Sequence, residues 1–233
     1  MHFDEPPIEG RLIERYKRFL ADVELSDGSV ITAHCPNTGS LLGCKEPGSR
    51  VWLRDSHNPG RKLRYTWQAV EVDGTWVNVD TSLPNRVVFD AIQERRIRPL
   101  AGYPWAKREV KYGQGSRIDI LLTKSNGERC YVEVKSTTLT DGRLGLFPDA
   151  VTARGKKHLQ ELVRMTRKGH RAVQLFLVGR ADVTRFRPAD AIDPAYCKEL
   201  RRAAAKGVEV LAYRTRVEPD RLEVDRKLPV DLR

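Results

Sequence analysis

Cysteine and long apolar runs are both scarce in this chain of 233 residues, and each scarcity excludes a class of protein. Its 4 cysteines are too few and too irregularly spaced for the disulfide framework of a small secreted domain. No apolar run approaches the ~18 residues that span a bilayer, and the acidic, proline-bearing start is unlike a signal peptide. We therefore expect a cytoplasmic globular protein with no membrane partner.

The cysteines also lack the arrangement of a zinc site. The spacing between Cys35 and Cys44 matches no zinc motif, and no second Cys/His pair follows them. We therefore expect no structural zinc.

Positive charge is what the chain has in excess, and the excess is confined to one part of it. Lys and Arg number 42 against 31 Asp and Glu, a net charge of +11. Residues 1–85 hold 10 basic and 12 acidic side chains, whereas residues 86–233 hold 32 and 19. Such a one-sided excess favours a polyanion such as DNA as the partner, because neutralised phosphates release condensed counterions. The alternative is a solvated surface whose charge only maintains solubility.

The first part of the chain, residues 1–83, is expected to form a small β-barrel domain. Strand-like runs alternate there with clusters of Gly, Pro and Asn, and no helical pattern appears. Such a pattern is typical of a small all-β barrel, and an oligonucleotide-binding (OB) barrel is one candidate. The expected strands are 12–24, 29–33, 51–54, 64–72 and 75–79.

The second part, residues 84–233, is expected to form an α/β domain with a mixed sheet. Its elements follow the order α-β-β-β-α-β-α-β, which implies helices packed on the faces of the sheet. An Asn126-Gly127 pair between the second and third strands predicts a tight hairpin. The expected strands are 107–112, 116–123, 129–137, 172–178 and, last, 208–213, with helices from Pro84, over 152–168 and from Pro194 to Gly207.

Three charged residues in the predicted hairpin form the sharpest chemical pattern. Asp119 lies in an apolar strand, and Glu133 and Lys135 lie two residues apart in the next, so they share one face about 7 Å apart. Asp followed by Glu-x-Lys is the PD-(D/E)xK pattern of restriction-endonuclease-like nucleases, and the element order matches their core. We expect Asp119 and Glu133 to hold Mg²⁺ and all three residues to be catalytic. The alternative is a cross-strand ion pair on a solvated face.

Further residues are candidates for the same site. Asp90, on the helix before the sheet, is either a third metal ligand or an ordinary surface acid. Arg154, Lys156 and Lys157 begin the basic helix and either contact DNA phosphates or form a solvated face. His158 follows them and either contacts a phosphate beside the metal or packs as a buried helix residue.

The beginning of the chain offers a second candidate surface for DNA. Arg15, Lys17 and Arg18 alternate with Tyr16 and Phe19, which on one strand would combine phosphate contacts with base stacking. The alternative is a half-buried strand with a charged outer face. A turn over 37–39 could also offer backbone N–H groups to an anion.

Six segments spread over nearly the whole chain resemble the sugar fermentation stimulation protein A family. They are YKRFLADV (16–23), HCPNTGS (34–40), EVKYG (109–113), SRID (116–119), YVEVKS (131–136) and FPDAVT (147–152). The resemblance implies a cytoplasmic prokaryotic protein that binds DNA with little sequence preference and regulates maltose metabolism. It also implies an OB-like domain followed by a nuclease-like domain. Two positions depart from the family pattern, with Asp90 in place of Glu and Lys156 in place of Gln.

Two functions of different classes follow from these patterns. One is a DNA-binding protein whose nuclease-like fold only holds DNA. The other is a Mg²⁺-dependent DNA nuclease that uses Asp119, Glu133 and Lys135.

Overall fold

The computed structural model describes residues 1–113 and 115–233, which form two six-stranded sheets and one small three-stranded sheet. The first sheet contains β1 (Ile8–Tyr16), β2 (Leu20–Leu25), β3 (Val30–His34), β4 (Arg50–Asp55), β5 (Tyr65–Val72) and β6 (Thr75–Asn78). The second contains β7 (Trp105–Tyr112), β8 (Ser116–Thr123), β9 (Arg129–Thr137), β12 (Arg171–Val178), β14 (Glu209–Glu218) and β15 (Arg221–Leu228). The small sheet contains β10 (Thr140–Asp141), β11 (Leu144–Phe147) and β13 (Arg185–Pro188). The helices are α1 (Pro84–Gln93), the short η1 (Arg98–Leu100), α2 (Ala153–Arg167) and α3 (Pro194–Ala205). None of the described helices is both long and apolar enough to cross a membrane.

The first sheet curls into the expected OB barrel around its own apolar core. Its strands follow the order β3-β2-β1-β4-β5-β6, and a β3–β5 pairing closes the barrel. Side chains such as Leu12, Val23 and Trp67 fill the interior. The expectation of one strand over 12–24 is wrong, because Lys17 and Arg18 turn the chain between β1 and β2 at φ of 47° and 67°. Residues other than glycine rarely adopt positive φ, so no turn signal marks this position.

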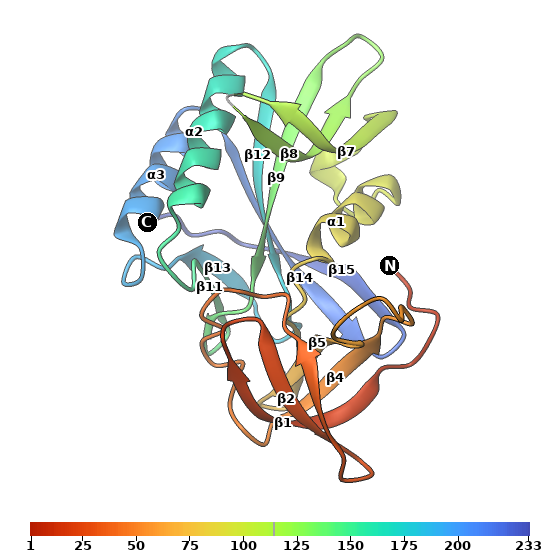
Figure 1. The fold of residues 1–233 in the computed structure, drawn as a ribbon. Helices are drawn as coiled ribbons and strands as arrows, with labels where there is room; N and C mark the ends of the chain where they lie inside the picture. The colour runs from red at the N-terminus through yellow and green to blue at the C-terminus, as the bar shows by residue number, and fades with distance from the viewer. Residues whose placement is uncertain (114) are drawn as a thin grey trace.

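The second sheet is mixed and lies between two layers of helix, as Figure 1 shows with α1 on one side and α2 and α3 on the other. The strand order is β15-β14-β12-β9-β8-β7. The helix expected from Pro84 is α1, and its Val87, Val88, Ala91 and Ile92 are buried in one core cluster. The expectation that 208–213 is the last strand is wrong, since β14 continues to Glu218 and turns back into β15.

One of the contacts between the barrel and the second domain is made by Asp149, which lies shortly before α2. The Asp149 Oδ2 accepts hydrogen bonds from the Ser40 hydroxyl at 3.1 Å and the Leu41 N–H at 3.2 Å, and the Ser40 hydroxyl also reaches the Asp149 carbonyl at 2.6 Å. The Gly39 N–H is used by the Asn37 side chain at 2.8 Å. The predicted anion site at the 37–39 turn is therefore next to a carboxylate of the protein itself, that of Asp149.

Asp149→Ala is expected to destabilise the protein by about 1–3 kcal/mol, because it removes a hydrogen-bonded carboxylate and leaves the Leu41 N–H without its partner. For a chain of this size that corresponds to a Tm lower by about 2–4 °C for each kcal/mol. Thermal unfolding followed by circular dichroism measures the change. Asp141→Ala, at an exposed carboxylate on β10, is the control and should change Tm little. Equal Tm values for both variants would contradict a joining role for Asp149.

Candidate metal and phosphate site

The candidate site lies where the backbones of β8 and β9 separate. Their pairing runs from Thr123 opposite Arg129 to Ile120 opposite Val132. One step further, the Asp119 carboxylate replaces the backbone as acceptor, because its Oδ2 accepts the Val134 N–H at 2.7 Å. Its Oδ1 accepts a hydrogen bond from the Asn85 Nδ2 on α1 at 2.8 Å. Asp119 of β8 is thus fixed against two other elements, β9 and α1, at the point where the strands separate.

Glu133 is almost completely buried, at 1% exposure, beside this opening. Its Oε1 accepts hydrogen bonds from the Lys135 Nζ at 2.6 Å and from the His158 Nδ1. Its Oε2 is buried and has no hydrogen-bond partner. One carboxylate oxygen is therefore satisfied by cationic and ring donors, and the other is left without a donor, which is costly for a charged group in a protein interior.

His158 completes the site as a buried partner of Glu133 rather than as a described phosphate contact. It lies on the first turns of α2, whose N-cap Thr152 accepts the Gly155 N–H at 3.0 Å. The Arg154 Nε donates to the His158 Nε2 at 3.4 Å, and on this basis we assign the ring proton to Nδ1, which faces Glu133 and also lies 3.3 Å from the Lys135 Nζ. The helical spacing of Arg154 and His158 was a signal for their contact, but nothing local indicated Glu133 as the partner.

The pKa values of Asp119 and Glu133 are shifted in opposite directions. Burial, together with the negative charge of Glu133, raises the pKa of Asp119 to about 6. Burial also acts to raise the pKa of Glu133, but the hydrogen bond from His158 and the charge of Lys135 outweigh it and lower that pKa. Separated pKa values in neighbouring carboxyl groups are a feature of functional sites.

The donor set fits a hard divalent cation. Carboxylate oxygens are the ligands that Mg²⁺ and Ca²⁺ prefer, and the unpartnered Oε2 of Glu133 has the free lone pairs that a metal ion needs. Asp90 is not brought to these oxygens by any described contact and pairs instead with the Arg86 Nε at 3.8 Å. The described residues contain no group of three or more Asp, Glu, His or Cys side chains arranged to hold a metal. A metal role for Asp90 stays a prediction.

The predicted DNA-contacting residues fall into two groups. Arg154, Lys156 and Lys157 are exposed on the first turns of α2 beside His158. The idea that Arg15, Lys17 and Arg18 alternate along one strand is wrong, because Lys17 and Arg18 form the exposed hairpin tip. Arg15 is used inside the barrel, where its Nη2 donates to the carbonyl oxygens of Arg18, Asn37 and Gly39, each at 2.8 Å.

Comparison with known proteins agrees with this architecture over the full length. Residues 13–79 match the family described as the SfsA N-terminal OB domain, and residues 82–221 match the sugar fermentation stimulation protein RE domain. Proteins named sugar fermentation stimulation protein homolog are similar to this chain. The one from Citrifermentans bemidjiense is 54% identical over 230 residues, covering 99% of both chains. The one from Thioalkalivibrio sulfidiphilus is 56% identical over 236 residues, covering 100% of this chain and 98% of that one.

A solved structure shares the whole fold. It is Pyrococcus furiosus SfsA in complex with Ca²⁺, at 29% identity and a TM-score of 0.90, covering 99% of this chain and 98% of the other. An OB barrel followed by a restriction-endonuclease-like domain with a mixed sheet defines the class of this protein. The chain belongs to the sugar fermentation stimulation protein family.

Asp119→Asn is expected to raise the stability of the metal-free protein above about pH 6. The raised pKa means that the folded state binds more protons than the unfolded state between about pH 4 and pH 6, so stability falls as pH rises through that window. The amide has no charge to bury, and its advantage should vanish below about pH 4. Tm measured with EDTA from pH 3.5 to 8 tests this, at about 2–4 °C per kcal/mol.

The control for the lost negative charge is Asp141→Asn, at an exposed position outside the site. If Asp119→Asn lowers Tm at pH 8, the hydrogen bonds of Asp119 stabilise the fold by more than its buried charge destabilises it, and our interpretation of the site is wrong.

Proposed function

We propose that this protein binds DNA with little regard to sequence and hydrolyses phosphodiester bonds with a Mg²⁺ ion held by Asp119 and Glu133. The observation that carries the proposal is the buried, unpartnered Oε2 of Glu133 beside the Asp119 carboxylate, whose pKa is raised. A cation between these groups would give the unpartnered oxygen a partner and offset the repulsion between the carboxylates.

Each protein group has a distinct part in such a reaction. A divalent ion, when bound, would supply a water of lowered pKa and stabilise charge on the phosphate. Lys135 lies 2.6 Å from Glu133 Oε1 with part of its side chain exposed, so its ammonium is available to a phosphoryl oxygen or to an attacking water. Arg154 orients His158, and His158 holds Glu133 in place. Arg154, Lys156 and Lys157 would contact neighbouring phosphates.

The related SfsA of Pyrococcus furiosus was solved in complex with Ca²⁺, which supports divalent ion binding in this fold. Ca²⁺ and Mg²⁺ use the same class of oxygen ligands but differ in size and coordination number.

A DNA-binding protein that does not cleave is the second candidate, and one contact favours it. Lys135 and His158 already neutralise one oxygen of Glu133. If this network closes the site to ions, only electrostatic DNA binding remains. The regulation of maltose metabolism implied by the family resemblance, like a cytoplasmic location, stays a prediction.

Glu133→Gln is expected to abolish nicking of supercoiled plasmid in Mg²⁺ or Mn²⁺ and to remove the rise in Tm that these ions cause by binding the folded state. The variant loses the ligand charge but keeps the shape of the side chain. Glu128→Gln is the matched control, since Glu128 is exposed in the turn of the same hairpin.

The Lys135→Met variant distinguishes metal binding from hydrolysis of DNA. Lysine is not a metal ligand, so this variant should keep most of the Mg²⁺-induced rise in Tm while losing nicking activity. The wild-type protein could instead bind plasmid without nicking it and bind no Mg²⁺ or Mn²⁺ at millimolar concentration in a calorimetric titration. That result would contradict the nuclease function and support a DNA-binding protein that does not cleave.

The DNA affinity is expected to fall steeply between 50 and 200 mM salt and to change little between unrelated duplexes. Reversing the charges of Arg154 and Lys156 should weaken binding more than reversing those of Arg221 and Arg226, because Arg221 is already paired with Glu218. Fluorescence anisotropy with labelled duplexes at several salt concentrations measures both effects. A strong preference for one duplex, or equal losses from both pairs, would contradict this picture of the DNA-binding surface.

A further inference from the structure

The two edges of the second sheet carry very different electrostatic surfaces. One edge is the β14–β15 hairpin and the other is the β7–β8 pair. Residues 209–228 hold five basic and five acidic side chains, whereas residues 105–123 hold four basic and two acidic ones. The regional excess of positive charge is therefore not shared equally between the edges.

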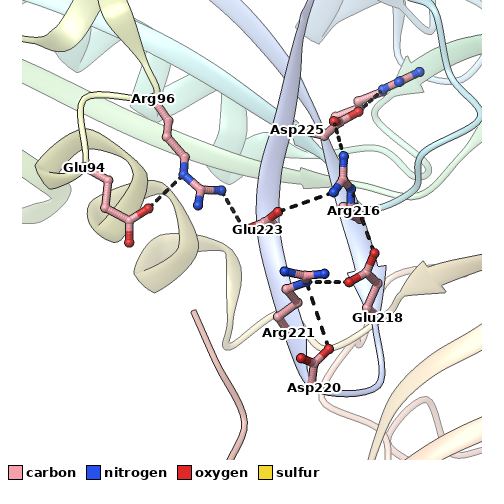
Figure 2. Close-up of polar contacts among 9 residues, drawn as sticks. Glu94, Arg96, Arg216, Glu218, Asp220, Arg221, Glu223 and Asp225 are labelled. Carbon is pink, nitrogen blue, oxygen red and sulfur yellow. Dashed lines mark hydrogen bonds and ion pairs between the residues drawn. The ribbon is translucent and has the colours of Figure 1, made fainter.

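At the β14–β15 edge Arg216 and Arg221 are paired with neighbouring acids, as Figure 2 shows. Arg216 lies 3.3 Å from Asp225 and 3.9 Å from Glu223, and Arg221 pairs with Glu218. Arg96, after α1, joins the same network through Glu223 at 2.6 Å. The charges of Arg214, Arg216 and Arg221 are thus offset by acids within a few ångströms, and only Arg226 and Lys227 are exposed on this hairpin without a described ion pair.

At the β7–β8 edge the cations have no such partners. Lys107, Arg108 and Lys111 on β7 and Arg117 on β8 are exposed. Within residues 1–113 and 115–233, none of the four makes a salt bridge with an acid. The Arg108 guanidinium lies 5.8 Å from the Phe89 ring of α1, a contact that leaves its charge uncompensated. The acid on β7, Glu109, is approached by the Asn85 amide instead.

These cations lie next to the carboxylates of the candidate site. Lys111 is directly opposite Arg117 in the strand register. Arg117 is two residues before Asp119 on β8, and since strand side chains alternate, both project from the same side of the strand. Arg117 and its partner Lys111 are therefore the cations of β7–β8 nearest to Asp119 in the strand register. They lie on strands, whereas Arg154 lies on α2.

We infer that the β7–β8 edge is a contact surface for the backbone of a DNA duplex bound at Asp119, in addition to the basic start of α2. The inference rests on the proposed DNA-binding function and names a surface that the sequence patterns had not indicated. Exposed ammonium and guanidinium groups without acidic partners are suited to phosphate contacts that position DNA without reading its bases. The exposed Trp105, at 56%, lies at the start of the same edge strand.

The test compares two double variants of the full chain that each remove two positive charges. Lys111→Gln/Arg117→Gln alters the proposed surface, and Arg216→Gln/Arg221→Gln is the control at the opposite edge. Affinity for a labelled duplex is measured from 50 to 300 mM salt. The slope of log K against log salt should become shallower by ~1.8 in the first variant, at about 0.9 for each lost phosphate contact, and stay unchanged in the control.

Arg117→Lys keeps the charge and should keep the wild-type slope. Tm values confirm that each variant is folded. If both double variants show the same slope, or if Lys111→Gln/Arg117→Gln weakens only single-stranded DNA, the inference is overturned.

Lysines on an edge strand also prevent pairing with a second copy. If Lys111→Gln/Arg117→Gln dimerises in sedimentation experiments and keeps the wild-type slope, the cations protect the edge and the inference is overturned. A wild-type protein that binds no duplex at 50 mM salt would overturn the proposed function together with the inference. A wild-type slope retained in all variants would overturn the inference alone.

Discussion

The arrangement of the second domain depends on the burial of one negative charge, the carboxylate of Glu133. A carboxylate at 1% exposure is tolerable only with donors around it, and the fold supplies Lys135 from the same strand and His158 from α2. These contacts require the first turns of α2 to lie directly over β9. Because desolvation offsets much of what a buried ion pair gains, an apolar residue would stabilise this position as well. The cost of the arrangement therefore argues for a chemical role.

The same constraint explains the unequal treatment of the two carboxyl groups. Both oxygens of Asp119 accept hydrogen bonds, yet burial and the charge of Glu133 raise its pKa to about 6. Glu133 stays ionised through Lys135 and His158, although one of its oxygens has no donor. The direct donors to Asp119 are neutral, and the charge of Lys135 does not offset its burial beside Glu133, so further positive charge would stabilise the ionised pair. This is the electrostatic requirement that a divalent cation meets.

Local signals predicted the parts of this site that lie within one hairpin. The Asn126-Gly127 turn and the alternation of Glu133 and Lys135 were sufficient to place both strands and their shared face. They were not sufficient for the turn at Lys17 and Arg18, where positive φ occurs without glycine. The partner of His158 could not be predicted either, because Glu133 lies 25 residues away on another element and only the packing of α2 brings the two together. Strand β15 was missed since its turn, at Pro219 and Asp220, has no glycine.

The barrel is coupled to the site through a short series of helix caps rather than through a flexible linker. Ser40 and Leu41 of the barrel bind Asp149, and three residues later Thr152 caps α2. The Thr152 N–H in turn donates to Asp193, the N-cap of α3, at 2.8 Å. These hydrogen bonds therefore connect the barrel to the start of α2, which carries His158, and they act together with barrel side chains such as Trp52 that pack in the core of the second domain. The start of α2 and the barrel are thus held in a fixed orientation relative to each other.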